Sequence, residues 1–333
     1  MRVGLIGAGA IARRHVEALR THPDVTIAAV CDVDAGRAEE LAAPAGGRAL
    51  TDWAELVDAA GVDAVLVCTP PAAHAGPAVA ALERGLAVYL EKPLARSAED
   101  GERIAAAWRR SGAVCAVGYQ WRSLTLLSRL RDALAVSPPG MLVSRSFGPT
   151  EPGRGDLTGA GRGSWFADRA AGGGILFELG SHDIDLQVAL AGPAAHVQAA
   201  GARGLLALHG GQRDLDDAVA VVIEFAGGAL GVLAVAWNPA HDPPVYTLDV
   251  DSQAAALHLE LDPAFRLTGS AGGAPVDVHE DADPRQRSID RFLAAARAGD
   301  PAAVPCTPGD ALETLRAALA AERAIAAGRR LPV

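Results

Sequence analysis

Short apolar runs and amphipathic stretches alternate along the first 120 residues of the chain. The apolar runs are rich in β-branched residues and are bounded by turn residues, which is typical of strands buried on both faces. The predicted strands are Arg2–Ile6, Thr26–Cys31, Ala64–Cys68, Ala87–Leu90 and Val114–Val117. The predicted helices between them are Ala10–Arg20, Gly36–Leu41, Trp53–Ala59, His74–Arg84 and Ala98–Arg110. This rhythm predicts an α/β fold with a doubly wound parallel sheet and helices on both of its faces.

The pattern changes near residue 140, where longer runs of alternating apolar and polar positions begin. A strand predicted at Met141–Phe147 is followed by a polar, glycine-rich segment, Gly148–Gly163, whose length is that of a loop or lid. A helix is predicted at about Gly174–Leu190. The further predicted strands are Val197–Leu206, Asp217–Phe225, Ala229–Trp237, Tyr246–Asp251 and Ala255–Leu259. Alternation of this kind predicts an α+β domain with a mainly antiparallel sheet.

The length of 333 residues fits two domains. We place the first at residues 1–120, where the series of predicted parallel strands ends, and the second at residues 121–333. Two more helices are predicted at Ser288–Ala298 and Pro308–Ala327, and they can pack on either domain.

The net charge of −10 carries no electrostatic signature of a nucleic-acid or anionic-membrane partner. No apolar stretch reaches the roughly 18 residues of a membrane-spanning helix. A predicted strand that starts at Arg2 leaves no room for a signal peptide. The cysteines, Cys31, Cys68, Cys115 and Cys306, are far apart and form no metal-binding pair. We therefore expect a cytoplasmic protein with buried, reduced thiols and no metal.

Of the 30 basic residues, 29 are arginine and one, Lys92, is lysine. Codon usage rich in G and C produces such a bias, so a lysine kept against it marks a position that needs a compact, titratable ammonium. Lys92 stands in Glu91-Lys92-Pro93, at the carboxyl end of a predicted strand. Ligands of open parallel sheets bind beyond these strand ends. We therefore expect Lys92 to act in a ligand crevice.

A glycine-rich turn of the pattern G-x-G-x-x-A joins the first predicted strand to the first helix. In a dinucleotide-binding βαβ unit, the first glycine permits the tight turn and the second lets a pyrophosphate approach the backbone. The small third residue lets the helix pack closely on the strand, and the N–H groups at the helix start favour phosphates. The residues predicted to bind the cofactor here are Gly7, Gly9, Ala10, Ile11 and Ala12.

Asp32 ends the second predicted strand, 23 positions after Gly9, close to the spacing of about 20 that this kind of site uses. Its carboxylate is expected to accept hydrogen bonds from the adenine ribose of NAD and to repel the 2′-phosphate of NADP. Arg37 is a residue that can attract that phosphate. The prediction is therefore NAD as the preferred cofactor, with NADP as the alternative.

A second ligand-binding turn is predicted at Cys68-Thr69-Pro70-Pro71, where another strand ends. His74 follows this turn and is expected to orient it rather than to carry out chemistry. Cys68, Thr69, Pro70 and His74, with Glu91 and Lys92, are further cofactor-binding candidates on the first domain.

The second chemical cluster lies in Gly172–Asp185, which reads G-G-G-I-L-F-E-L-G-S-H-D-I-D. In an α-helix, Glu178 and His182 share one face, and Asp185 lies nearly one turn beyond the histidine. Carboxylates on either side hold a histidine in one tautomer and raise its pKa, which suits a general acid–base. The three glycines argue for close approach of the backbone to a ligand.

These motifs, in this order, resemble the Gfo/Idh/MocA family, which comprises proteins like glucose–fructose oxidoreductase and inositol 2-dehydrogenase. The order is G-A-G-x-I-A, then Asp32, T-P-x-x-x-H, E-K-P-L-A, G-Y-Q-W-R and G-G-G-x-x-x-E-x-G-x-H-x-x-D. The resemblance covers essentially the whole chain. It implies an N-terminal NAD(P)-binding Rossmann domain and a C-terminal substrate domain with an open antiparallel sheet. Family members commonly form dimers or tetramers through that sheet.

The resemblance also implies residue roles. Lys92 matches the lysine that contacts substrate and the nicotinamide ribose and assists proton transfer, and His182 matches the usual acid–base. Glu178 stands where the family often has aspartate, and Gln120 stands where many members have an asparagine beside the nicotinamide. Substrate contacts are implied for Tyr119, Arg122, Trp165, Asp185 and Tyr246, in addition to Lys92 and His182. Trp165 is equally well explained as a core residue.

We therefore predict an NAD(P)-dependent oxidoreductase that acts on a secondary alcohol or ketone of a sugar, cyclitol or related polyol, as a homodimer or homotetramer. Two alternatives stay open. One is a reductase or dehydrogenase of the same fold with a non-sugar substrate, such as an imine or a dihydrodiol. The other is a non-catalytic regulator that senses a dinucleotide. A regulator has no need to keep both Lys92 and His182, which favours an enzyme.

Overall fold

The computed structural model describes residues 1–59, 61–135, 137–148, 165, 168–205, 215–238, 240–241 and 243–333. The chain divides into two compact units. The first comprises Met1–Ser123 with Asp283–Leu312, and the second comprises Leu124–Ala282 with Glu313–Val333. The loop or lid expected after Gly148, and the last residue of the strand expected at Val197–Leu206, lie outside the described residues.

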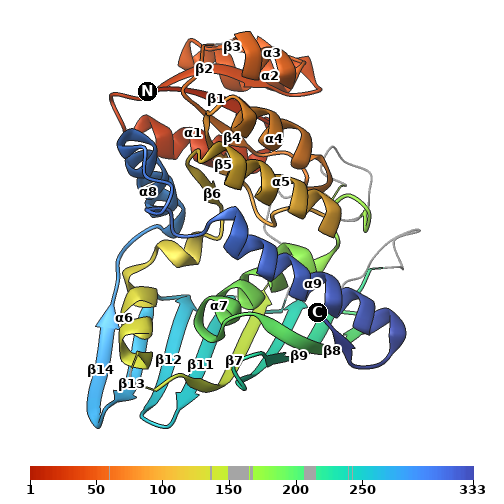
Figure 1. Cartoon of the computed structure of the whole chain (residues 1–333), viewed down its shortest axis with the longest axis vertical. Coiled ribbons are helices and arrows are strands. Elements are labelled where there is room, and N and C mark those ends of the chain that lie inside the picture. Colours follow the sequence, from red (N-terminus) through yellow and green to blue (C-terminus); the bar gives the residue numbers. More distant parts are fainter. Residues whose placement is uncertain are drawn as a thin grey trace. The chain divides into compact units, whose positions relative to one another are not determined.

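The first unit contains a six-stranded parallel sheet in the order β3-β2-β1-β4-β5-β6 (Figure 1). Its strands are β1 (Arg2–Ile6), β2 (Thr26–Cys31), β3 (Arg48–Leu50), β4 (Ala64–Val67), β5 (Ala87–Leu90) and β6 (Cys115–Val117). The predicted parallel sheet is confirmed, and five strands lie within one residue of the predicted runs. The prediction omits β3, because this strand has three residues and buries only Leu50.

The main helices between these strands are α1 (Ala10–Arg20), α2 (Ala35–Ala42), α3 (Trp53–Ala59), α4 (Ala75–Glu83) and α5 (Ala98–Ser111). At the start of α5, the Ser97 hydroxyl accepts the N–H of Asp100, and Gly112, with φ of 64°, ends the helix. α1 begins differently, because Gly9 stands at its N-cap and, among the described residues, no side-chain cap hydrogen bond is formed there. That end of α1 is therefore suited to an external acceptor.

α8 (Pro284–Ala298) comes from the far end of the chain and belongs to the first unit. Its Ile289, Phe292 and Leu293 are fully buried in the core that also holds Leu5 and Val16. Burying large apolar side chains completely contributes about 1.5–3 kcal/mol each, so α8 is an integral part of this unit.

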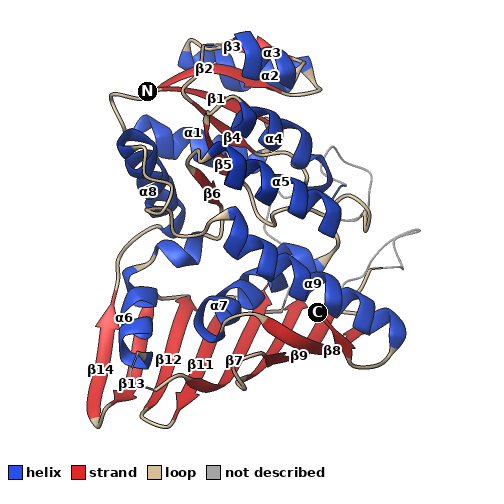
Figure 2. Ribbon diagram, in the orientation of Figure 1, coloured by secondary structure: helices blue, strands red, loops and turns tan. Residues whose placement is uncertain are grey.

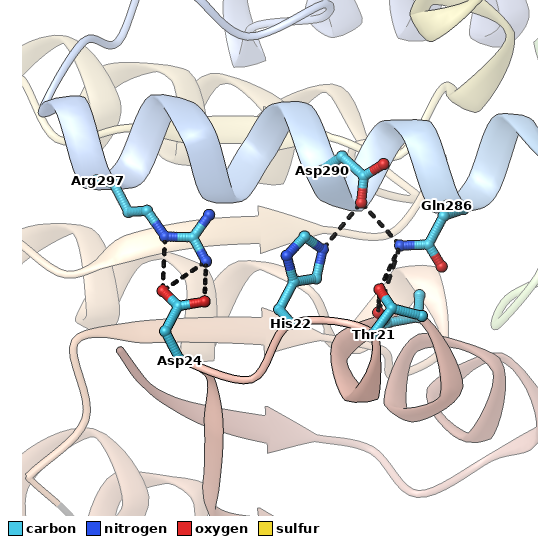
Figure 3. Close-up of polar contacts among 7 residues, drawn as sticks. Thr21, His22, Asp24, Gln286, Asp290 and Arg297 are labelled. Carbon is cyan, nitrogen blue, oxygen red and sulfur yellow. Dashed lines mark hydrogen bonds and ion pairs between the residues drawn. The ribbon is translucent and has the colours of Figure 1, made fainter.

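Ion pairs also fasten α8 to the segment that follows α1 (Figure 3). Arg297 donates two hydrogen bonds to the carboxylate of Asp24, at 2.9 and 3.0 Å. Nearer the start of α8, Asp290 Oδ1 lies 2.9 Å from His22 Nε2. Both pairs are partly solvent-exposed, so they orient α8 while the buried apolar residues supply most of the stability.

The second unit contains a nine-stranded sheet in the order β14-β13-β12-β11-β7-β10-β9-β8-β15. Its strands are β7 (Pro139–Gly148), β8 (Ala194–Ala202), β9 (Ala218–Phe225), β10 (Leu230–Trp237), β11 (Val245–Ser252), β12 (Ala255–Asp262), β13 (Arg266–Ala271), β14 (Ala274–His279) and β15 (Leu331–Pro332). β7 and β10 pair in parallel, and the other neighbours are antiparallel. This confirms the mainly antiparallel sheet.

The prediction omits the hairpin of β13 and β14 at one edge of this sheet. Leu267 is the one residue that the two strands bury, and it is fully covered. An edge hairpin with so few buried positions carries almost no alternating apolar signal. β15 is omitted as well, since it has two residues.

Helices pack on one face of the second sheet (Figure 2). α6 (Thr125–Leu134), another element that the prediction omits, contacts β12 and β13, and α7 (Ser181–Ala191) contacts β7 and β10. The final helix, α9, spans Pro308–Ala327 as predicted. Within the part of the chain that the structure describes, no helix combines the length and the apolarity needed to cross a membrane.

The four cysteine thiols are buried and form no disulfide among the described residues, as expected. Burial raises the pKa of Cys31 to about 11 and that of Cys68 well above its ordinary value. These thiols are therefore protonated and unreactive near neutral pH.

Candidate active site

The turn between β1 and α1 brings three strands together around Gly7. Its backbone has φ of +96°, a region that favours glycine. A side chain here would also collide with the main chain at the end of β4, because a Cβ atom would lie 2.6 Å from the Cys68 carbonyl oxygen. The N–H of Gly7 donates to the carbonyl of Cys31 at 2.8 Å. The first glycine is thus required by the protein's own packing.

Gly9 has the opposite environment. A Cβ atom built on it would meet no heavy atom of the described residues within 4 Å. Open space above an uncapped helix start is what a pyrophosphate requires, since its oxygens can then accept the N–H groups of α1. Ala12, the small third residue of the motif, is fully buried. The turn therefore fits a dinucleotide.

Asp32 lies beside this turn at the end of β2. Its Oδ2 accepts the N–H of Ala8 at 2.7 Å, and its Oδ1 accepts the N–H of Asp34 at 2.9 Å. Each carboxylate oxygen keeps a lone pair for a ribose hydroxyl. Arg37 lies on the first turn of α2, where its Nε is 3.9 Å from Asp34 Oδ2.

Val33 is a residue of this edge that the sequence prediction missed. Its side chain is 95% exposed, although it is apolar and directly follows Asp32. A single exposed apolar side chain is common on protein surfaces, and this one offers an apolar surface on which a flat ring can pack. The available signal was an apolar residue in an otherwise polar turn.

The turn after β4 is held by His74. Its Nε2 lies 2.9 Å from the carbonyl oxygen of Thr69, and its Nδ1 lies 3.0 Å from that of Pro93. Burial lowers the pKa of His74, although these carbonyls oppose the change. His74 therefore joins the turn after β4 to the one after β5. The Thr69 hydroxyl is buried with no hydrogen-bond partner among the described residues, which leaves it to bond a ligand.

Lys92 follows β5 and is partly exposed. The preceding Glu91 is buried, and its Oε2 accepts the Lys92 N–H at 3.2 Å. Its Oε1 lies 2.6 Å from Nε2 of His15 in α1. His15 is a second residue that the prediction missed. The available signal was a histidine on the apolar face of a helix.

The segment after β6 holds three more candidates. Tyr119 and Arg122 are almost completely buried, while Gln120 is partly exposed. Arg122 Nη1 lies 3.9 Å from Asp310 Oδ2. The guanidinium thus has a carboxylate neighbour from the start of α9, a contact that sequence spacing does not reveal.

The glycines before His182 have a structural reason of their own. A Cβ atom on Gly172 would lie 2.7 Å from the carbonyl oxygen of Trp165, and one on Gly174 would lie 3.1 Å from Leu215. Gly173 and Gly174 have φ of 84° and 71°. Close approach by the protein itself therefore accounts for these glycines, and the expected reason, approach of a ligand, is not needed.

The helix expected at Gly174–Leu190 begins with a π-helical turn, Leu176–Gly180, and continues as α7. The prediction of one continuous α-helix is therefore wrong at this point. A π turn has i→i+5 hydrogen bonds, so the α-helical spacing used to place Glu178 and His182 on one face does not apply through it. Glu178 is partly exposed and lies in the π turn, while His182 is 9% exposed and lies in the first turn of α7. π turns are frequent at functional sites.

The two aspartates that follow His182 are buried. Asp185 is 1% exposed, and its Oδ1 accepts the hydroxyl of Thr314 in α9 at 3.0 Å. Asp183 Oδ1 accepts the hydroxyl of Ser146 in β7 at 2.9 Å. Both carboxylates therefore anchor α7. Tyr246, the last candidate, lies in β11 beside Ser146.

Comparison with known proteins agrees with this geometry. Residues 1–119 match the model described as an oxidoreductase family with an NAD-binding Rossmann fold, and residues 143–274 match the GFO/IDH/MocA C-terminal domain. The chain belongs to the Gfo/Idh/MocA family. The resemblance seen in the motifs is thus confirmed, and so is the two-part α/β architecture that this family has.

Two curated relatives within the Gfo/Idh/MocA family act on inositol by name. Inositol 2-dehydrogenase 3 of Saccharopolyspora erythraea is 38% identical over 157 residues, or 46% of each chain. Myo-inositol 2-dehydrogenase of Thermotoga maritima is 27% identical over 237 residues, which is 70% of this chain and 67% of that one. The chain thus matches about half to two thirds of the length of these relatives.

Among solved structures, levoglucosan dehydrogenase in complex with NADH and L-sorbose has the same fold. It aligns with a TM-score of 0.85 and 20% sequence identity, over 100% of this chain and 98% of that one.

Proposed function

We propose that the protein is an NAD-dependent oxidoreductase that transfers hydride between nicotinamide and a secondary alcohol or ketone of a sugar, cyclitol or related polyol. One observation carries the proposal. The open, uncapped start of α1 and the chain's single lysine stand at the carboxyl ends of strands of one parallel sheet. A phosphate cradle and a cationic acid at the same sheet edge are what a dinucleotide-dependent dehydrogenase needs.

In this proposal, NAD lies along the turns after β1, β2, β4 and β5. The start of α1 binds the pyrophosphate, Asp32 accepts the adenine ribose hydroxyls, and Val33 contacts the adenine ring. The Thr69 hydroxyl, buried without a partner among the described residues, faces the cofactor. His74 holds the shape of these turns through its contacts with main-chain carbonyls.

The catalytic roles go to Lys92, His182 and Glu178. NAD, when bound, supplies the hydride acceptor or donor. We assign to His182 the role of taking the proton of the reacting hydroxyl, and to Lys92 the role of donating a hydrogen bond that stabilises developing negative charge on the substrate. Glu178 orients His182. Asp185, buried against Thr314, keeps α7 in place rather than meeting the substrate.

The substrate class follows from the relatives, whose names specify inositol and levoglucosan as substrates. Polyols offer adjacent hydroxyls that bind polar side chains, and Tyr119, Arg122 and Tyr246 are the candidates for these contacts. The residues that would distinguish one polyol from another include Trp165.

We also propose that the protein is cytoplasmic and forms a homodimer or homotetramer through the outward face of the nine-stranded sheet. Three apolar side chains in paired strands are 37–39% exposed on this face: Met141, Val222 and Leu230. Exposed apolar groups of this kind on a sheet are favourable sites of association. Sedimentation velocity tests the proposal, and a monomer at micromolar concentration would contradict it.

Replacement of Lys92 by arginine tests the catalytic role. A guanidinium is planar and does not release its proton, so we expect Lys92→Arg to lower turnover by about 100-fold or more. NAD affinity is expected to stay within a few-fold. Turnover is measured as NADH formation with a panel of cyclitols and sugars.

The matched control is Arg103→Lys, at an exposed ion pair with Asp100 on α5, which should leave turnover unchanged. Near-normal turnover in Lys92→Arg would refute the assigned role. Absence of NADH formation by the native protein with every substrate would instead favour a dinucleotide-sensing regulator.

A further inference from the structure

A buried contact between a histidine and a carboxylate lies next to Lys92. Nε2 of His15 in α1 is 2.6 Å from Oε1 of Glu91, and the two side chains are only 1% and 12% exposed. The residues are 76 positions apart in sequence. A short contact of this kind between a histidine and a carboxylate is a charge-assisted hydrogen bond, which is stronger than a neutral one.

The second oxygen of Glu91 continues the contact to Lys92. Oε2 accepts the main-chain N–H of Lys92 at 3.2 Å. One carboxylate therefore bonds the ring of His15 with one oxygen and the backbone of Lys92 with the other. This arrangement restricts the backbone from which the lysine side chain extends.

Aromatic and hydroxyl groups pack tightly around the pair. The His15 ring meets the Tyr89 ring edge-on, with centroids 5.2 Å apart, and the Tyr89 hydroxyl lies 3.0 Å from the Ser288 hydroxyl of α8. Gly118 closes the other side, because a Cβ atom there would lie 3.3 Å from Glu91 Oε1. The carboxylate thus has little freedom to move.

Nδ1 of His15 is buried and has no hydrogen-bond partner among the described residues. An unsatisfied buried polar atom costs about 1–3 kcal/mol. A leucine in its place would pack in the same core without that cost. The histidine is therefore a poor choice for stability alone, and its polar bonding is directed to Glu91.

The charge of Glu91 is maintained by its surroundings. Burial by itself raises the pKa of this carboxyl, but the hydrogen bond and charge of His15, with the charges of Lys92 and His74, outweigh it and hold the pKa below its usual value. Besides Lys92, the titratable groups that face Glu91 are His15, His74, Tyr89 and Cys68. The carboxylate is thus ionised at neutral pH beside the one lysine.

We propose that His15 is a positioning residue for Lys92: by binding the Glu91 carboxylate, it fixes the Lys92 backbone and keeps a negative charge beside the Lys92 ammonium. This rests on the proposed catalytic role of Lys92. It adds to that role the means by which the ammonium form is favoured.

The test uses the full-length chain and compares His15→Leu, Glu91→Gln and the double variant. His22→Leu is the matched control, because His22 likewise contacts a carboxylate of the first unit, that of Asp290 in α8 (Figure 3). The probe is the Nζ resonance of ¹⁵N-labelled lysine. Since the chain has one lysine, its titration reports Lys92 alone and needs no turnover.

We expect the pKa of the Lys92 ammonium to fall by about one unit in Glu91→Gln, which removes the negative charge, and to fall by less in His15→Leu, which releases the carboxylate from its position; the double variant should fall no further than Glu91→Gln. His22→Leu should leave it unchanged. With an active substrate, kcat should fall about 10-fold at high pH, while the NAD Kd stays within twofold.

Two results would overturn the proposal. One is an unchanged pKa of Lys92 in His15→Leu, and the other is a double variant whose shift in that pKa equals the sum of the shifts in the two single variants. If His15→Leu does not fold, His15→Gln keeps a donor to Glu91 without charge and should show a smaller fall in the same pKa. A native protein that turns over no polyol would contradict the proposed function, but the titration would still decide the link between His15 and Lys92.

Discussion

At the residue scale, Asp32 has two tasks. It accepts N–H groups from Ala8 and Asp34, which shapes the turns after β1 and β2, and it presents a negative charge at the edge where an adenine ribose is proposed to bind. A serine keeps an acceptor for the backbone but removes the charge. The two tasks can therefore be separated by one substitution.

We predict that Asp32→Ser relaxes discrimination against NADP by about 10-fold or more, because the carboxylate no longer repels the 2′-phosphate. Dissociation constants of NADH and NADPH, measured by fluorescence, give the ratio without any substrate. Asp34→Ser is the control, since serine keeps the cap of α2 and only a neighbouring charge is lost. An unchanged ratio in Asp32→Ser would refute the ribose assignment.

At the element scale, α7 binds the second sheet through a buried polar layer. Asp183 accepts the Ser146 hydroxyl, and the Gln187 amide donates to the Ser144 hydroxyl at 2.9 Å. Asp183 Oδ2 is buried without a partner in the described part of the chain. Burial raises the pKa of Asp183 from 3.8 to about 7, although Ser146 and Ser144 oppose the change.

This predicts a pH-dependent stability. Between pH 4 and 7 the folded state holds a proton on Asp183 that the unfolded state releases, so the free energy of unfolding falls as pH rises and levels off above 7. Asp183→Asn lacks this titration. Each pKa unit is worth about 1.4 kcal/mol, so the variant should gain stability relative to the native chain by up to about 4 kcal/mol from pH 4 to pH 8.

Urea unfolding of the native chain and of the Asp183→Asn variant, compared at several pH values, measures this gain in the free energy of unfolding. Asp132→Asn, at an exposed position of α6, is the control and should follow the native pH dependence. A gain that does not vary with pH, or one that the control shares, would contradict the raised pKa of Asp183.

At the scale of the whole molecule, the first unit is assembled from two distant parts of the chain. Residues Met1–Ser123 supply the sheet, and Asp283–Leu312 supply α8 and a further edge contact, in which the N–H of Val117 donates to the carbonyl of Cys306. Three fully buried side chains of α8 contribute about 5–9 kcal/mol by burial, which is comparable to the net stability of a domain.

We predict that a fragment of residues 1–120 does not fold cooperatively. A chain in which residues 1–123 are joined by a flexible linker to residues 283–312 is expected to fold cooperatively. The physical reason is that the apolar surface normally covered by α8 is exposed to water in the fragment that lacks this helix. Thermal unfolding followed by circular dichroism compares the two chains, and NADH binding serves as a second measurement. Equal melting temperatures would show that α8 is dispensable.

Local patterns in the sequence determined much of this protein. The apolar runs predict five strands of the parallel sheet to within one residue, because a strand buried on both faces must be apolar throughout. The first glycine of the turn after β1 is also determined locally, because a φ of +96° at Gly7 favours glycine over other residues. The position of Lys92 at a strand end also follows from periodicity, while its catalytic role and that of His182 stay predictions.

Only the tertiary structure decided the rest. The π turn before His182, the edge hairpin that contains β13 and the place of α8 in the first unit depend on packing between distant segments. The pair of His15 and Glu91 is the clearest case, because 76 residues separate two side chains that lie 2.6 Å apart. Sequence periodicity reports which face of an element is buried, but the partner that buries it is chosen when the whole chain folds.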